Sequence, residues 1–293
     1  MYRRVTSTKL RVYANAALHY GLERNWDRTV TPASADRFER IVSDFADYET
    51  VFVHAGLSDV KQAFQCDPYD FLLRVLDENF ENILVPGFTP AFRDSAVYHK
   101  EHSRPAFGAF SRLFLDDAEY RTDDAIHSIL VKGDYRFDDC DHHDSFSEAG
   151  CWASLDRDDV LILNVGTDWI VSTQHHFLER HFDVPYVSSA THDGVLFDGS
   201  GDHEQITQVN YEYTMPMKRN SLAIQTYLAE TGALTKHDLQ GLNVMAISAR
   251  DLREGLAPAV DRDPYFMVAC STETLRADSL PSACKKSLYN IMG

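Results

Sequence analysis

The chain has 293 residues, of which 28 are Lys or Arg and 45 are Asp or Glu, so its formal net charge at pH 7 is −17. Hydrophobic residues make up 44% and aromatic residues 12%, as in an ordinary folded globular protein. The acidity argues against a nucleic acid or an anionic membrane as the partner, because both require a basic face. A small anionic ligand remains compatible with it, since such a ligand needs only a local cluster of positive charge.

Short apolar runs alternate with helix-like segments along the chain. In chain order they predict a helix over 36–48, a strand at Thr50–Ala55, a helix that begins at Asp67-Pro68, a strand at Asn82–Val85 ended by Pro86-Gly87, a helix at Phe107–Asp116, strands at Ser128–Val131 and Val160–Val165, a helix after Ser172 and a strand at Gln205–Tyr213. Two of these strands, Thr50–Ala55 and Val160–Val165, are mostly apolar on both faces, which indicates burial on both sides. The alternation predicts a layered α/β fold. We expect a single domain over residues 1–293.

The five cysteines form no C-x-x-C pair, and their number is odd. This predicts reduced thiols rather than a disulfide framework or a zinc ribbon. The acidic and histidine-rich run 139–144 (DCDHHD) lacks the spacing of known metal motifs, so we expect no metal. No apolar run of signal-peptide or membrane-spanning length occurs, and we expect a soluble, cytoplasmic protein.

A long loop is predicted between Phe88 and Pro105, and loops of this length are often functional. It concentrates positive charge in an acidic chain, with basic side chains at Arg93, His99, Lys100, His102 and Arg104. Two interpretations stay open at this point: an anion site, or a solvated loop.

The segment 164–182 (NVGTDWIVSTQHHFLERHF) carries a buried strand into a polar turn and a helix. Such strand ends and helix starts often line sites in α/β proteins. Thr173 and His176 share a helix face, as do His176 and Glu179. This arrangement offers a general base and a hydroxyl for an oxyanion, while an amphipathic helix with surface histidines is the alternative. His54, at the end of the first strand, is either catalytic or a core histidine.

Motifs for other chemistries are missing. The chain has no G-x-x-x-x-G-K-[ST], no G-x-G-x-x-G and no G-x-S-x-G sequence. The absence argues against an ATPase, a dinucleotide-dependent dehydrogenase and an ordinary α/β-hydrolase.

Several blocks, in order, resemble the aminoglycoside 3-N-acetyltransferases, the antibiotic N-acetyltransferase family that is unrelated to the GCN5-like fold. The blocks are FVHAGL at 52–57, ENILVPGFT at 81–89, FGAFSRLF at 107–114, YRTDDAIHSILVKG at 120–133 and VLILNVGTDWIVSTQHHFLE at 160–179. The resemblance covers about 45–215. It implies an α/β/α fold around a central mixed sheet and a CoA-dependent transfer of an acyl group to an amine.

Departures from the family pattern fall where the acceptor would bind. Asp124-Ala125 stands in place of the family's His-Pro pair, although Ser128 is kept. The loop that follows residue 88 is closer to the nucleotide-sugar N-acyltransferases, which acylate dTDP-linked amino-deoxy sugars. That acceptor is our first hypothesis. An aminoglycoside 3-N-acetyltransferase and a non-catalytic binding protein on the same fold are the alternatives.

The resemblance also implies roles for individual residues. His176 corresponds to the general base, and Glu212, 36 residues later, to the carboxylate that orients it. Thr173 corresponds to the residue that meets the oxyanion or the leaving thiolate.

The remaining expected contacts divide between the two substrates. Acetyl-CoA or another short acyl-CoA is expected to contact His54, Gly56, Leu57, Ser58, Ser128, Lys100 and Arg104. The acceptor is expected to contact Arg93, Glu179 and Asp124. Lys132 and Arg121 are expected to extend the positive cluster, and a homodimer is expected for a metabolic enzyme of this size.

Overall fold

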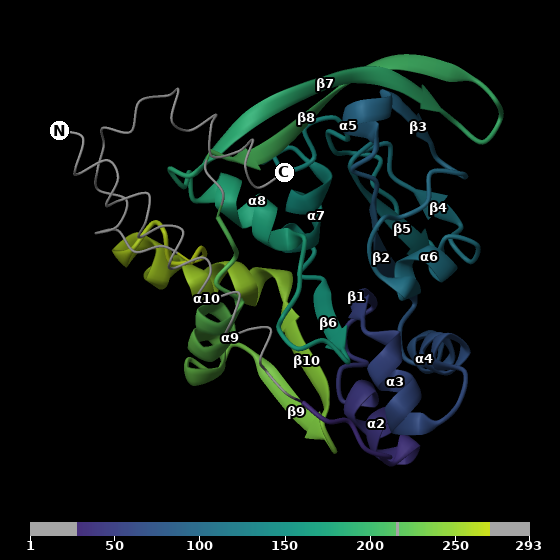
Figure 1. Ribbon diagram of the computed structural model, residues 1–293, viewed down its shortest axis with the longest axis vertical. Coiled ribbons are helices and arrows are strands. Elements are labelled where there is room, and N and C mark those ends of the chain that lie inside the picture. The colour runs from purple at the N-terminus through teal and green to yellow at the C-terminus, as the bar shows by residue number, and fades with distance from the viewer. Residues whose placement is uncertain (1–27, 215–216, 270–293) are drawn as a thin grey trace.

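The computed structural model describes residues 28–214 and 217–269, and its centre is a seven-stranded mixed sheet (Figure 1). In spatial order the strands are β4 (Tyr120–Arg121), β5 (His127–Lys132), β2 (Asn82–Phe88), β1 (Thr50–Ala55), β6 (Leu161–Val165), β10 (Leu242–Ser248) and β9 (Thr235–Leu239). Strand β1 pairs in parallel with β2 and β6, and the other neighbouring pairs are antiparallel. The predicted central mixed sheet is confirmed.

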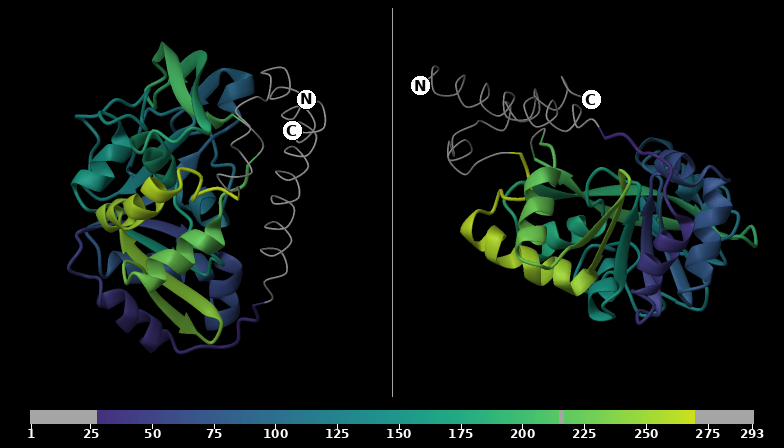
Figure 2. Two further views of the ribbon diagram at one scale, coloured as in Figure 1. Left: turned by 90° about the vertical axis from the view of Figure 1, so that its left-hand side faces the viewer. Right: turned by 90° about the horizontal axis from the view of Figure 1, so that it is seen from below.

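Helices cover both faces of this sheet (Figure 2). One face carries α2 (Ala35–Ser43), α3 (Leu57–Phe64), α4 (Pro68–Asp77) and α6 (Ala109–Phe114), and the other carries α7 (Cys151–Arg157), α8 (Gln174–His181), α9 (Ser221–Glu230) and α10 (Ala249–Arg262). Within β1, Val51 and Val53 pack into the first layer and Phe52 packs into the second. Alternate residues of a strand point to opposite faces, so a strand between two helical layers must carry apolar side chains on both faces.

Of two local predictions in the N-terminal half of the chain, one is confirmed and the other is wrong. The Asp67 carboxylate accepts hydrogen bonds from the backbone of Tyr69 and Asp70, which confirms it as the cap of α4. Pro86-Gly87 does not end β2, which continues to Phe88. Pairing with β1 stops at Leu84, so Pro86 has a strand neighbour on one side only and its missing N–H interrupts no ladder there.

A smaller three-stranded sheet lies beside the main one. It consists of β3 (Val97–His99), β7 (Val187–Phe197) and β8 (His203–Tyr213), and the β7–β8 hairpin arches across the top of Figure 1. The segment predicted as a plain loop therefore contains β3 and the short helix α5 (Phe92–Ser95). Side chains from this segment, from the hairpin and from the turn before β5 share a small core of their own: Phe92, Tyr98, Ala125, Ile126, Leu196 and Ile206.

Cys140 and Cys151 form a disulfide, so the prediction of reduced thiols is wrong for this pair. A backbone bridge between Asp141 and Gly150 folds the intervening loop back on itself and brings the two Cα atoms to 5.0 Å. Such a pairing depends on a loop shape that cysteine spacing does not reveal. His142 lies beside the two sulfurs, but its ring nitrogens are bonded to backbone groups. Cys270 and Cys284 lie outside the described residues.

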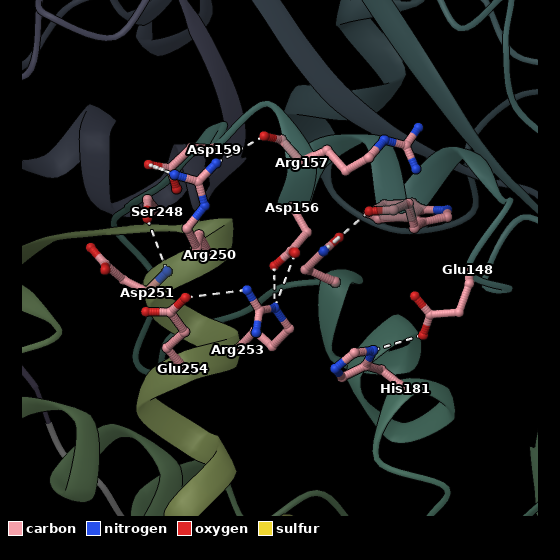
Figure 3. A network of polar contacts seen from close by, with 12 residues as sticks. Glu148, Asp156, Arg157, Asp159, His181, Ser248, Arg250, Asp251, Arg253 and Glu254 are labelled. Carbon is pink, nitrogen blue, oxygen red and sulfur yellow. Dashed lines mark hydrogen bonds and ion pairs between the residues drawn. The ribbon is translucent and has the colours of Figure 1, made fainter.

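Polar contacts join α7 to α10 (Figure 3). The Arg253 guanidinium donates to both carboxylate oxygens of Asp156 at 3.0 Å, and Arg250 donates to the Arg157 carbonyl at 2.8 Å. Helix α8 is attached to α7 through Gln174, whose amide donates to the Trp152 carbonyl. No helix in the part of the chain that the structure describes is both long and apolar enough to cross a membrane.

Candidate active site

Helix α8 presents His176 and Glu179 as a hydrogen-bonded pair. The imidazole Nδ1 lies 3.0 Å from Glu179 Oε2, as expected for side chains three residues apart on one helix face. The side chain of Glu179 is 1% exposed and that of His176 is 29% exposed. Because Nδ1 is occupied, Nε2 is the nitrogen left to exchange a proton with a substrate.

Three groups hold the Glu179 carboxylate in place. The second oxygen accepts a hydrogen bond from the Tyr213 hydroxyl at 3.0 Å, and the partly buried Arg219 guanidinium lies 3.8 Å away. Burial by itself raises the pKa of Glu179, but the His176 hydrogen bond, Arg219 and Tyr213 outweigh it and hold that pKa below its ordinary value. The carboxylate is therefore charged and can stabilise a proton on the imidazole.

Glu212, expected to orient the imidazole, lies elsewhere. Its carboxylate is 3.6 Å from His192 Nε2 on the neighbouring strand. Tyr213, the next residue of β8, is the one that reaches Glu179. Consecutive side chains of a strand point to opposite faces, so Glu212 and Tyr213 cannot both face α8. The carboxylate that bonds to the imidazole is thus that of Glu179, which we expected to contact the acceptor, and not that of Glu212.

The loop between β6 and α8 is fixed by buried side chains. Asn164, 0% exposed at the penultimate position of β6, accepts hydrogen bonds from the Val171 backbone and the Thr167 hydroxyl. Gln225 of α9 accepts one from the Ile170 backbone. At the start of the helix, the Ser172 hydroxyl accepts from the Gln174 backbone. These bonds determine where α8 starts and so where His176 projects.

A cavity of about 360 Å³ opens at the carboxyl ends of β1 and β6. It is lined by His54, Ala55, Pro86, Phe88, Phe107, Gly108, Ser111, His127, Thr167, Val171, Thr173 and His176. The structure thus brings together three residues expected at the site: His54, Thr173 and His176. This cavity is the candidate active site, because the His176 imidazole, held from behind by Glu179, lines it.

His54 forms part of the inner wall of this cavity. Its side chain is 8% exposed, its ring lies 5.2 Å from that of Phe52, and its Nε2 is buried without a hydrogen-bond partner. Desolvation lowers its pKa to about 3, so the ring is neutral at physiological pH. An inaccessible nitrogen favours the core-histidine interpretation over a catalytic one.

His127 lies in the cavity and was missed from the sequence. We assigned the adjacent Ser128 to the site, but its hydroxyl donates to the Gly87 carbonyl and accepts from Arg121 in the interior. In β5 these two residues point to opposite faces, and His127 is paired with Phe88 on the cavity side. Two sequence signals taken together could have identified His127: the alternation of side chains along its strand, and the position of His54 at the end of the first strand.

Other residues expected to bind acyl-CoA have structural roles. Leu57 packs into the core beneath α2 and α4, and the Gly56 backbone N–H donates to the Val165 carbonyl. A Cβ on Gly56 would approach the Gly166 oxygen to 2.3 Å, so the close passage of β1 and β6 requires this glycine. Ser58 is exposed in the first turn of α3.

The predicted positive cluster is largely neutralised. Lys100 pairs with Asp123 and Lys132 pairs with Asp77, each at 2.5 Å. Arg121 is 5% exposed and donates to three carbonyls, those of Gly87, Lys100 and Ser103, and so holds the segment that follows β2. Arg93 and Arg104 remain exposed and form no ion pair within the described residues.

Asp124, expected to bind the acceptor, is a structural residue. It is 1% exposed, and its Oδ1 accepts hydrogen bonds from the backbone of Ile126 at 2.8 Å and of His127 at 2.7 Å. Its other oxygen accepts from the Ser145 hydroxyl. The residue therefore shapes the turn into β5 and has no access to a ligand.

A family model described as aminoglycoside 3-N-acetyltransferase matches residues 52–257. Among solved structures, the fold is similar to AAC-IIIb in a binary complex with CoASH (TM-score 0.65, 14% identity, 79% of this chain and 98% of that one). It is also similar to apo aminoglycoside acetyltransferase AAC(3)-IVa (TM-score 0.64, 15% identity, 89% and 99%) and to YokD of Bacillus subtilis (TM-score 0.60, 14% identity, 79% and 94%). No curated protein sequence matches the chain significantly.

Proposed function

The chain belongs to the aminoglycoside 3-N-acetyltransferase family of CoA-dependent N-acetyltransferases, and we propose that it transfers an acetyl or short hydroxyacyl group from acyl-CoA to the amine of a nucleotide-linked amino-deoxy sugar. The observation that carries the acyl transfer is the His176–Glu179 pair, whose imidazole lines the 360 Å³ cavity and has Nε2 left to exchange a proton.

The proposed reaction is a direct transfer. The amine attacks the thioester carbonyl carbon while His176 Nε2 takes its proton, and a C–N bond forms as the C–S bond breaks. The same proton passes from the imidazolium to the leaving thiolate, so the imidazole returns to its neutral state. Glu179 stabilises the transient imidazolium from its Nδ1 side, which is the contribution of a buried carboxylate in such pairs.

The cavity wall supports an acceptor that is not a polycation. Histidine, aromatic, aliphatic and hydroxyl side chains line it, and no described carboxylate is among them. A drug with several ammonium groups would lose hydration there without gaining ion pairs. Desolvation, His176 and, least of the three, Arg93 lower the pKa of His127, and Phe107 and Val171 expose apolar surface at the cavity. Such surroundings suit a sugar attached to phosphates.

An aminoglycoside is the second candidate acceptor. The family description names this activity, and the net charge of −17 is compatible with a cationic drug.

Thiol release separates the two candidates. The purified protein is mixed with acetyl-CoA and with dTDP-amino-deoxy sugars or with gentamicin, sisomicin and kanamycin, and free CoA is measured with a thiol reagent. We expect turnover with at least one nucleotide-linked amine, and turnover with the drugs alone would contradict the proposal. The His176→Ala variant serves as the inactive control. Cytoplasmic location and a homodimer stay predictions, and light scattering tests the second.

A further inference from the structure

His127 is a second imidazole in the cavity, and the mechanism above leaves it unused. Its ring centroid lies 5.7 Å from that of His176 and it stacks on Phe88 at 4.7 Å, with an interplanar angle of 20°. Phe146 meets the ring nearly edge to face at 4.9 Å. Its backbone N–H is fixed by Asp124. The orientation of the ring is therefore determined by packing on both sides rather than by hydrogen bonds of its own.

The ring nitrogens of His127 are left available. No hydrogen bond to either nitrogen is formed within the described residues, and neither is enclosed in the way that Nε2 of His54 is. His176, by contrast, has one nitrogen occupied by Glu179. A cavity-facing imidazole that packing holds without a protein partner is preorganised to bond to a ligand.

The charge state of His127 determines what it can offer. Desolvation, the neighbouring His176 and Arg93 all lower its pKa well below the ordinary value for histidine. The ring is neutral near pH 7 and carries one N–H donor. A neutral imidazole can donate to a developing oxyanion without competing for the amine proton.

We propose that His127 is a catalytic residue that donates a hydrogen bond to the thioester carbonyl oxygen while negative charge develops on it. The proposal rests on the acyl-transfer function proposed above. Its N–H keeps its proton throughout, and the proton of the amine still travels through His176 to the leaving thiolate. Two imidazoles side by side then divide the work between base and oxyanion donor.

Infrared spectroscopy tests this without an acceptor. Acetyl-CoA labelled with ¹³C at the carbonyl is bound to His176→Ala and to the double variant His127→Phe/His176→Ala. We expect a lower carbonyl stretching frequency in the single variant, because only there does the oxygen accept the bond. Equal frequencies would overturn the proposal. Phe keeps the stacking on Phe88, and a His127→Gln/His176→Ala variant, which retains an N–H donor, is expected to regain part of the shift.

Kinetics provide the second readout. In the otherwise native protein, His127→Phe is expected to lower kcat about 100-fold with a KM for acetyl-CoA within about twofold, as for loss of one oxyanion donor. His181→Gln, on the outer side of α8, is the matched control and should leave kcat unchanged. A loss of kcat without a frequency difference would contradict the proposal. If no amine of the panel is accepted while the frequency difference is present, the acceptor hypothesis fails and the role of His127 stands.

Discussion

The clearest test of the site is the replacement Glu179→Gln. It preserves the size and shape of the side chain and removes its charge. Oε2 lies 3.0 Å from Nδ1 of His176, and the side chain is 1% exposed, so water cannot replace the lost interaction. The amide keeps a contact with the ring but no longer stabilises the imidazolium.

The expected loss follows from Coulomb's law. Two unit charges about 4 Å apart interact by about 4 kcal/mol at an effective dielectric constant of about 20. This interaction exists only when the imidazole is charged, so it lowers the barrier rather than substrate binding. At about 1.4 kcal/mol per factor of ten, kcat should fall about 1,000-fold.

The assay is steady-state thiol release with acetyl-CoA and an accepted amine, with Glu212→Gln as the matched control. Glu212 makes a partly exposed contact at 3.6 Å with His192, so its replacement should change kcat by no more than about fivefold. Thermal unfolding of both variants checks that the protein stays folded when the partly buried Arg219 loses its counter-charge. A large loss for Glu212→Gln and a small one for Glu179→Gln would refute the assignment of the pair.

Further predictions concern stability. His54 and His175 are buried with pKa values of about 3, mainly through desolvation, against 6.5 in an unfolded chain. The unfolding free energy should fall by about 1.4 kcal/mol per histidine per pH unit as the pH drops from 6.5 toward 3. In His175→Gln, the unfolding free energy measured by urea titration at several pH values should therefore depend less steeply on pH. Reducing the Cys140–Cys151 disulfide, with its sequence separation of 11, should cost about 3 kcal/mol in the chain-entropy model, measured by denaturation with and without a phosphine. Asp124→Ala should destabilise by about 2–4 kcal/mol and Asp124→Asn by less, because Asn still accepts the two backbone bonds; equal effects would contradict this.

The central sheet was predictable because its strands are governed by burial. The bounds of β1 agree with the prediction residue for residue, since an apolar run between two helical layers admits one interpretation. The segment between Phe88 and Pro105 was harder. Its short β3 is stabilised by pairing with β7, which is almost 100 residues away in the chain. Local pattern carries no information about such a partner.

The site was predictable only where helix periodicity applies. His176 and Glu179 were correctly placed on one face of a helix. The sequence could not decide, however, whether the carboxylate that bonds to His176 belongs to Glu179 or to Glu212, 36 residues later. His175 would be a surface residue if the helix were simply amphipathic with surface histidines, but it is 0% exposed, with Nδ1 bonded to the Ser172 carbonyl at 2.9 Å. Adjacent histidines on a helix point about 100° apart, so one faces the cavity and the next faces the core. Which of the two is buried depends on the layer packed against the helix.

Net charge is a weaker guide to the acceptor than the cavity wall. A chain with a net charge of −17 attracts cations at long range, but at physiological ionic strength the screening length is about 8 Å. Recognition is therefore decided by side chains within that distance of the reacting amine. Those lining the cavity include no described carboxylate, while the Glu179 carboxylate lies behind His176 at 3.0 Å from its Nδ1. The acceptor therefore meets neutral imidazoles at the cavity wall, with the Glu179 carboxylate paired behind one of them, and the average charge of the chain says little about this surface.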